Sequence, residues 1–239
     1  MRELIVAIQF LTRLPTPRIA VSDEAFARSM RWFPAVGLIV GLLVMAGAWA
    51  GAGMGAWVAA LVGLILWVGV TGALHLDGLG DMADASGAAH KDRDRLRAVL
   101  ADPHVGSFAV VAIGLQLLAK LILLAALIER QLYLPLLLIP FAARIGPLVW
   151  TRWLPPLHAG LGARFVGIVR LIDLSLWGAA LLLAALAVPA LLATPLLMLL
   201  WGLWLRKRIG GISGDSHGAG IELTESGLLF ITLVLASLP

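Results

Sequence analysis

The sequence contains no cysteine among its 239 residues, and only 13% of them are charged. The absence of cysteine excludes disulfides, iron–sulfur clusters and zinc sites built on thiolates. A soluble domain carries about 25% charged residues, whereas 61% of this chain is hydrophobic and its mean hydropathy is +0.98. The shortage of charge predicts an all-α fold, a polytopic transmembrane helical bundle, with residues 1–239 forming a single integral-membrane domain.

Long apolar runs predict about seven membrane spans after a short N-terminal helix. The predicted spans cover 33–52, 55–75, 105–128, 132–151, 174–189, 190–205 and 224–238. Residues 3–14 are apolar but too short to cross, so we expect an interfacial or re-entrant helix there. The run 174–205 would make a helix of about 48 Å, longer than the roughly 30 Å hydrocarbon core. Pro189 and Pro195 offer a break, and we expect two crossings.

The basic residues orient this bundle. Most lysines and arginines fall in four segments, 13–31, 76–104, 152–172 and 206–220. With two crossings in the long apolar run, all four segments lie on one side, which should be the cytoplasm. Arginines in cytoplasmic loops also account for the net charge of +4. We therefore expect the lipid bilayer as a partner, and no nucleic acid.

Three aspartates follow the second apolar run at positions i, i+4 and i+7: Asp77, Asp81 and Asp84. On a continuous helix they lie within about 60° of one another on one face. Three like charges at the edge of hydrocarbon repel one another and are costly to desolvate, and a cation between them relieves both penalties. Carboxylates without thiolates select a hard divalent ion, Mg²⁺ before Mn²⁺ or Ca²⁺. The pattern predicts a magnesium site at a membrane surface.

A second polar segment, residues 210–225, is rich in glycine and carboxylates. We expect a flexible loop whose backbone N–H groups turn toward an anion. The glycines concerned are Gly210, Gly211 and Gly214. Asp215 and Glu222 are expected to add metal ligands to the aspartate site. Glu225 either joins them or stabilises the N-terminus of the last helix through its dipole.

Each of four further side chains has two possible roles. Arg144 lies within a predicted span and needs an anion, either a protein carboxylate or a substrate phosphate. His75 either supports the aspartates or is a satisfied interface histidine. Arg93 either clamps phosphate or lies on a solvated helix. Lys120, inside the third span, is expected to snorkel outward or to pack in the bundle, and is left out of the site.

Five segments together resemble the cobalamin synthase (adenosylcobinamide-GDP ribazoletransferase) family. They are 10–15, which contains Arg13, 33–41, 75–84, 160–165 and 210–225. The resemblance implies a Mg²⁺-dependent, multi-pass catalytic domain of the bacterial inner membrane with its active site facing the cytoplasm. The reaction it implies joins adenosylcobinamide-GDP to α-ribazole or its 5′-phosphate, giving adenosylcobalamin or its 5′-phosphate and GMP.

The implied chemistry agrees with the residues. Joining an alcohol to a diphosphate requires charge stabilisation on the transferring phosphoryl group, and carboxylate-bound divalent ions provide it. We expect Asp77, Asp81 and Asp84 to hold Mg²⁺, with Asp215 completing the site; one catalytic aspartate, Asp81 or Asp84, could instead accept the hydroxyl proton. Substrate binding is expected from Arg13 and from the histidine, arginines and glycines named above.

Two rival functions stay open at this point. Paired acids and broken helices also build cation pathways, so a polytopic cation transporter is the rival that is not an enzyme. A CDP-alcohol phosphotransferase is the nearest enzymatic rival, although Gly80 and Asp81 stand where its motif has an Ala-Arg pair. The sequence also leaves open whether the protein forms a homo-oligomer.

Overall fold

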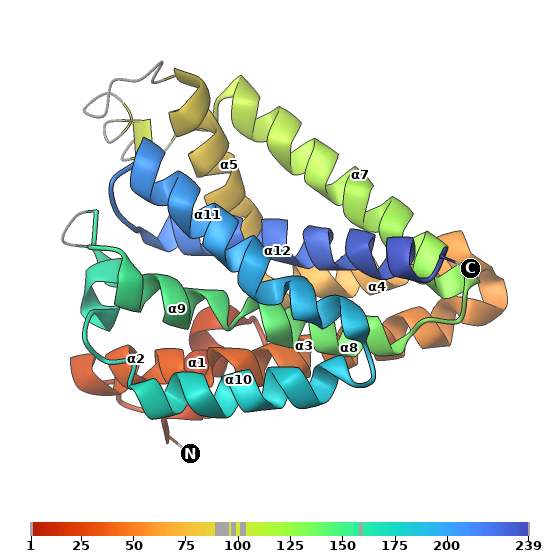
Figure 1. Ribbon diagram of the computed structural model, residues 1–239, viewed down its shortest axis with the longest axis horizontal. Helices are drawn as coiled ribbons and strands as arrows, with labels where there is room; N and C mark the ends of the chain where they lie inside the picture. The colour runs from red at the N-terminus through yellow and green to blue at the C-terminus, as the bar shows by residue number, and fades with distance from the viewer. Residues whose placement is uncertain (1, 89–95, 97–98, 101–103, 158–159, 239) are drawn as a thin grey trace.

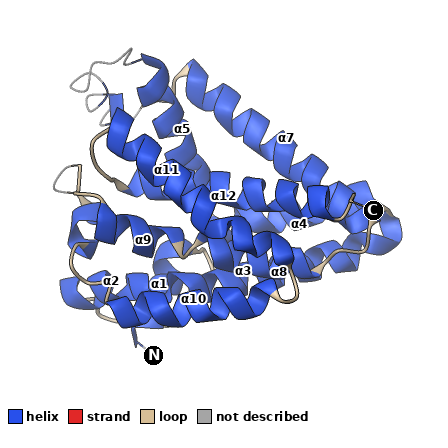
Figure 2. Cartoon of the chain, viewed as in Figure 1, coloured by secondary structure: helices blue, strands red, loops and turns tan. Residues whose placement is uncertain are grey.

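The computed structural model describes residues 2–88, 96, 99–100, 104–157 and 160–238, and these residues fold into helices (Figures 1 and 2). The α-helices are α1 (Arg2–Leu11), α2 (Asp23–Ser29), α3 (Phe33–Gly51), α4 (Ala56–Thr71), α5 (Leu74–Ala88), α7 (Ser107–Glu129), α8 (Leu134–Ala143), α9 (Gly146–Trp153), α10 (Leu171–Ala185), α11 (Thr194–Arg208) and α12 (Gly214–Leu235). Short 3₁₀ helices include η1 (Met30–Trp32), η3 (Leu161–Phe165) and η4 (Pro189–Ala193). The predicted all-α class is confirmed.

Five helical stretches of the described chain are long and apolar enough to cross a membrane: Asp23–Met54, Ser107–Glu129, Leu134–Trp153, Pro189–Arg208 and Gly214–Leu235. A sixth is reached if α4 and α5, which meet at 84°, form one broken span. The remaining predicted span, 174–189, corresponds to α10, whose 15 residues are short for a crossing. The break predicted near Pro189 is confirmed, because α10 ends at Ala185 and α11 begins at Thr194.

The prediction of a flexible loop over 210–225 is wrong for most of that segment. α12 begins at Gly214, and its N-cap Ser213 accepts a hydrogen bond from the N–H three residues on, at 3.2 Å. The glycines that suggested a loop instead leave one face of α12 without side chains, so that neighbouring helices can approach its backbone closely. A Cβ at Gly218 would lie 3.1 Å from the α5 backbone, and one at Gly220 would lie 2.5 Å from tryptophan ring atoms. Close helix packing here overrides the low helix propensity of glycine.

The aspartate segment is helical but is not a continuation of α4. Gly72 and Ala73 adopt left-handed conformations, with φ of +61° and +58°, and redirect the chain. α5 therefore starts a new helix that carries Asp77, Asp81 and Asp84. The helical spacing that grouped the three aspartates on one face holds.

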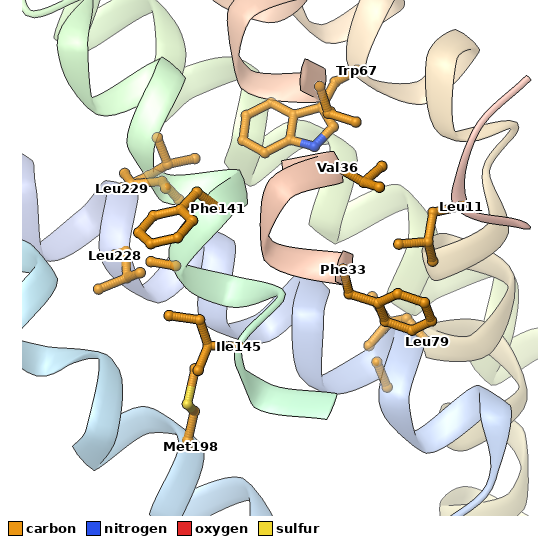
Figure 3. Packing of buried hydrophobic residues seen from close by; sticks show 14 of the residues in the cluster. Leu11, Phe33, Val36, Trp67, Leu79, Phe141, Ile145, Met198, Leu228 and Leu229 are labelled. Carbon is orange, nitrogen blue, oxygen red and sulfur yellow. The ribbon is translucent and has the colours of Figure 1, made fainter. Parts of the chain in front are cut away.

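α12 lies at the centre of the bundle and contacts α5, α7, α8, α9 and α11, the last of which crosses in front of it in Figure 1. α3 packs against α4 and α8. A Cβ at Gly41 would come within 2.1 Å of the Leu137 carbonyl oxygen, so α3 and α8 touch backbone to backbone. Figure 3 shows the buried side chains between these helices, including Trp67 and Phe141. Apolar side chains of α7, α10 and α11 are exposed on the outside, as lipid contact requires.

Candidate functional site

Two glycines on facing helices bring α5 and α12 together. A Cβ at Gly78 would lie 2.7 Å from the carbonyl oxygen of Asp215, and one at Gly218 would lie 3.1 Å from the Cα of His75. Both distances are shorter than ordinary van der Waals contact, so the two backbones touch at this crossing. The crossing places Asp215 of α12 beside the aspartates of α5, although about 130 residues separate them in the sequence.

The four aspartates form one cluster of negative charge. The charges of Asp215, Asp77 and Asp84 all act on Asp81. Across the described residues, no group of three or more His, Asp or Glu side chains has the geometry of a ready-made metal site. The donor chemistry nevertheless suits a hard divalent cation, because four carboxylates gather here and their mutual repulsion is the penalty that such a cation would relieve.

Asp84 has a structural task within this cluster. Its Oδ2 accepts the Gly106 N–H at 2.7 Å, and its Oδ1 accepts the Ala109 N–H at 2.9 Å. These are N–H groups at the start of α7 that have no partner inside the helix, so Asp84 caps α7 from α5. The helix dipole adds a further attraction for the carboxylate. Between the two aspartates considered for catalysis, this engagement favours Asp81.

A cavity of about 170 Å³ adjoins the cluster. Three phenylalanines from α1, α3 and η3 supply part of its wall: Phe10, Phe33 and Phe165. Its polar lining consists of Asp77, Asp215, His75 and His217. The cavity is therefore largely apolar and opens onto two of the clustered carboxylates, which suits a ligand with an apolar body and a reactive polar end.

His75 and His217, the two histidines that line the cavity, each have one buried ring nitrogen with no hydrogen-bond partner among the described residues. His75 Nδ1 lies 3.5 Å from Arg144 Nη2, while its Nε2 has no partner. His217 Nε2 lies 3.2 Å from the Thr151 hydroxyl, while its Nδ1 has none. His217 was not among the predicted site residues, because a loop was predicted over 210–225. The position of His217, two residues after Asp215, could have indicated that it lies at the site.

A buried network of charges lies deeper in the bundle. Lys120 Nζ lies 2.7 Å from Glu222 Oε2 and 2.6 Å from Glu225 Oε2. Arg144 Nη1 lies 2.9 Å from Glu225 Oε1. Gln116 donates to Glu222 at 2.8 Å, and the Lys120 ammonium also lies 4.3 Å from the centroid of the Trp67 ring. Two cations and two anions give the network no net charge, which buried ions require.

This network bears on four expectations. Glu222 is paired with Lys120, not grouped with the aspartates as a metal ligand. Arg144 is fully buried and finds its anion in Glu225, so the protein carboxylate, not a substrate phosphate, is its partner. Glu225 is in the middle of α12, not at its N-terminus. Of the two alternatives for Lys120, packing in the bundle is confirmed, since only 2% of the residue is exposed.

The glycines before α12 have backbone reasons to be glycine. Gly210 has a φ of +87°. A Cβ at Gly211 would lie 2.9 Å from the Pro155 carbonyl oxygen, and a hydrogen bond of 2.9 Å from the Ile212 N–H to that oxygen holds the segment in place. Of the three glycines expected to bind phosphate, only Gly214 lines the cavity.

Arg13 and Arg93 are the other two arginines expected to bind substrate. Arg13 is exposed, and its backbone N–H donates to Val70 O at 2.7 Å. Its side chain passes Gly72, where a Cβ would lie 2.4 Å from Arg13 Nε, so it lies at the α4–α5 bend. Arg93 is outside the residues that the structure describes.

The fold and this site define a class: a polytopic helical membrane protein with clustered carboxylates beside a small apolar cavity. The chain matches the model of the cobalamin-5-phosphate synthase family over residues 3–234, and it belongs to that family. A relative from Novosphingobium aromaticivorans is 66% identical over 233 residues, 96% of this chain and 95% of the relative. One from Laribacter hongkongensis is 53% identical over 245 residues, 100% of this chain and 99% of the relative. Both are named adenosylcobinamide-GDP ribazoletransferase.

No solved structure matches the chain at a significant level. The family resemblance noted in the sequence is confirmed by the family model and by these full-length relatives.

Proposed function

We propose that this protein is an adenosylcobinamide-GDP ribazoletransferase. In the proposed reaction a ribose hydroxyl of α-ribazole, or of its 5′-phosphate, attacks the phosphoryl group attached to cobinamide. The new phosphodiester bond forms as the diphosphate linkage breaks, and GMP leaves. The named relatives match this chain over nearly its whole length. The structural observation that carries the proposal is the α5–α12 crossing, which places the aspartate cluster beside a cavity.

Three steps are assigned to the chain's own residues. Asp81, on which the charges of the other three aspartates all act, is proposed to accept the hydroxyl proton, since both oxygens of Asp84 cap α7. Asp77 and Asp215 lie at the cavity and are proposed to hold Mg²⁺. When bound, the ion would supply positive charge to the transferring phosphoryl group and to the leaving phosphate. Arg13, exposed at the α4–α5 bend, is proposed to contact phosphate.

The proposed setting is the inner membrane, with the site facing the cytoplasm. The basic segment 13–31 lies between cavity-lining Leu11 and Phe33 in the sequence, the basic segment 206–220 contains cavity-lining Asp215, and basic segments stay on the cytoplasmic side. Cytoplasmic access also suits a reaction whose product, GMP, is a soluble nucleotide.

The test is GMP release from adenosylcobinamide-GDP and α-ribazole by the protein purified in detergent. Asp81→Asn should lower kcat by about 10²- to 10⁴-fold, the range for loss of a general base. Glu24→Gln is the matched control, since Glu24 pairs with Arg28 in an exposed i, i+4 contact. Chelation should abolish turnover, and added Mg²⁺ should restore it. Near-normal turnover by Asp81→Asn would reject its role, and absence of GMP release by the unaltered protein would reject the function.

A further inference from the structure

The cavity beside the aspartates is built for an aromatic fragment. The rings of Phe10 and Phe33 have centroids 5.9 Å apart, and Phe165 lies 6.3 Å from the first and 5.9 Å from the second. Sites that enclose a drug-sized ligand measure about 300–1,000 Å³, whereas this cavity measures about 170 Å³. It therefore takes one ring system of a substrate, not a corrin ring or a whole dinucleotide-sized molecule.

The hydrogen bond to Arg144 fixes which nitrogen of His75 carries the proton. A guanidinium group has no lone pair to accept with, so at the 3.5 Å contact it donates and His75 Nδ1 accepts. Nδ1 is then unprotonated, and the proton of the imidazole is on Nε2. Arg144 is itself held by Glu225 at 2.9 Å. His75 Nε2 is buried, has no hydrogen-bond partner among the described residues and belongs to a residue that lines the cavity, so a ligand there could satisfy this N–H donor.

Building on the function proposed above, we propose that this cavity receives the planar base of the acceptor nucleoside, with His75 Nε2–H donating to the unsubstituted ring nitrogen. Ribazole is the riboside of a dimethylated benzimidazole, which has an apolar body and a single free ring lone pair. The phenylalanines cover its apolar surface, and the ribose leaves the cavity past Asp77 and Asp215. The acceptor hydroxyl is thereby delivered to the aspartate cluster.

The same lining disfavours guanine, the other planar base among the substrates. Guanine carries donors and acceptors along most of its edge, and each one buried without a partner is costly. Asp77 and Asp215 are assigned to the metal ion, which leaves the two histidines, each with one ring nitrogen that has no partner among the described residues, too few polar groups for the edge of guanine. His217 suits either base nitrogen or ribose oxygen, because the Thr151 hydroxyl that contacts its Nε2 can donate or accept.

The first test measures binding without turnover. Equilibrium binding of α-ribazole and of GMP is compared for the unaltered protein, His75→Leu and His75→Gln in detergent. His75→Leu should raise the Kd for α-ribazole about tenfold, the value of one hydrogen bond, and leave the Kd for GMP unchanged. His75→Gln keeps an N–H donor and should recover part of the loss. In turnover the KM for α-ribazole should rise while kcat changes by less than about twofold.

A second pair of variants tests the aromatic wall. Phe26 and Phe165 belong to the same ring cluster, with centroids 5.1 Å apart, but only Phe165 lines the cavity. Phe165→Leu should raise the Kd for α-ribazole several-fold, and Phe26→Leu, the matched control, should not. Because each change removes a ring of the same size from one cluster, a general loss of packing would affect both variants alike.

Two outcomes overturn the proposal. If His75→Leu and Phe165→Leu weaken GMP or adenosylcobinamide-GDP instead of α-ribazole, the cavity belongs to the nucleotide donor. If neither variant changes any Kd, the cavity is not a ligand site. Failure of the proposed function is a separate result: the unaltered protein would then release no GMP, while these binding measurements, which need no turnover, would still decide the base site.

Discussion

Replacing Gly78 with alanine should separate catalysis from stability in this protein. The new Cβ would lie 2.7 Å from the Asp215 carbonyl oxygen and 2.9 Å from its Cα, both backbone atoms of α12. Ordinary contact begins at 3.4 Å, so α12 must retreat by about 0.7 Å to restore it. A misplacement of about 1 Å at a reacting centre costs about 10²-fold in rate. We therefore expect kcat for GMP release to fall by about that factor.

The thermal stability should change far less than the rate. Overpacking costs about 1–3 kcal/mol, and alanine in a helix interior returns about 1 kcal/mol relative to glycine. These opposing contributions leave a loss of about 0–2 kcal/mol, a shift in Tm of several degrees at most. Gly218→Ala should have a smaller effect on rate, because its Cβ would lie 3.1 Å from α5.

Gly114→Ala is the control for both variants. Gly114 is in α7, and a Cβ there would meet nothing within 4 Å. We expect unchanged kcat and an equal or higher Tm. A kcat for Gly78→Ala within twofold of the unaltered protein would refute the view that contact between α5 and α12 sets the geometry of the aspartate cluster.

Further predictions concern the charges. Glu225→Gln leaves Lys120 and Arg144 with only Glu222 and should lower the free energy of unfolding by about 3–5 kcal/mol, whereas the double variant Lys120→Met/Glu225→Gln restores neutrality and should have a higher Tm than either single variant. Asp84→Ala removes the cap of α7 and should cost about 0.5–2 kcal/mol, measured by Tm; an unchanged value would contradict the capping role. The hydrogen bond from Arg170, with help from Arg31, holds the pKa of Asp173 below its usual value of 3.8. The stability that ionised Asp173 contributes is complete above its unfolded pKa and is lost as pH falls through its folded pKa. The Asp173→Asn variant should therefore lose less Tm than the unaltered protein when the pH is lowered below about 4.

The sequence predicted the helix class and the aspartate face because both depend on local pattern. The spacing of Asp77, Asp81 and Asp84 is a property of one helix, and apolar runs mark spans wherever they occur. The break between α10 and α11 was also predictable, since proline acts on its own backbone.

What the sequence could not supply were pairings between distant segments. Glycine has a low helix propensity, yet the glycines of α12 lie within a helix and allow close contact with neighbouring helices. Only the structure of those neighbours shows that these glycines do not interrupt the helix. Arg144 was known to need an anion, but the choice of Glu225, 81 residues away, is a tertiary fact. The unpartnered nitrogens of His75 and His217 likewise become informative only when the cavity they line is known.

The neutral network around Lys120 has a consequence for how the protein is made. Translation delivers the two cations first, Lys120 on α7 and Arg144 after α8, and delivers Glu222 and Glu225 only with the final helix. Until α12 joins the others, two positive side chains within hydrocarbon have no counterion, which is costly in a bilayer. A nascent chain interrupted before residue 214 therefore retains two unpaired buried cations that the completed protein does not have. This difference gives membrane proteases a physical basis for distinguishing the incomplete chain from the completed protein.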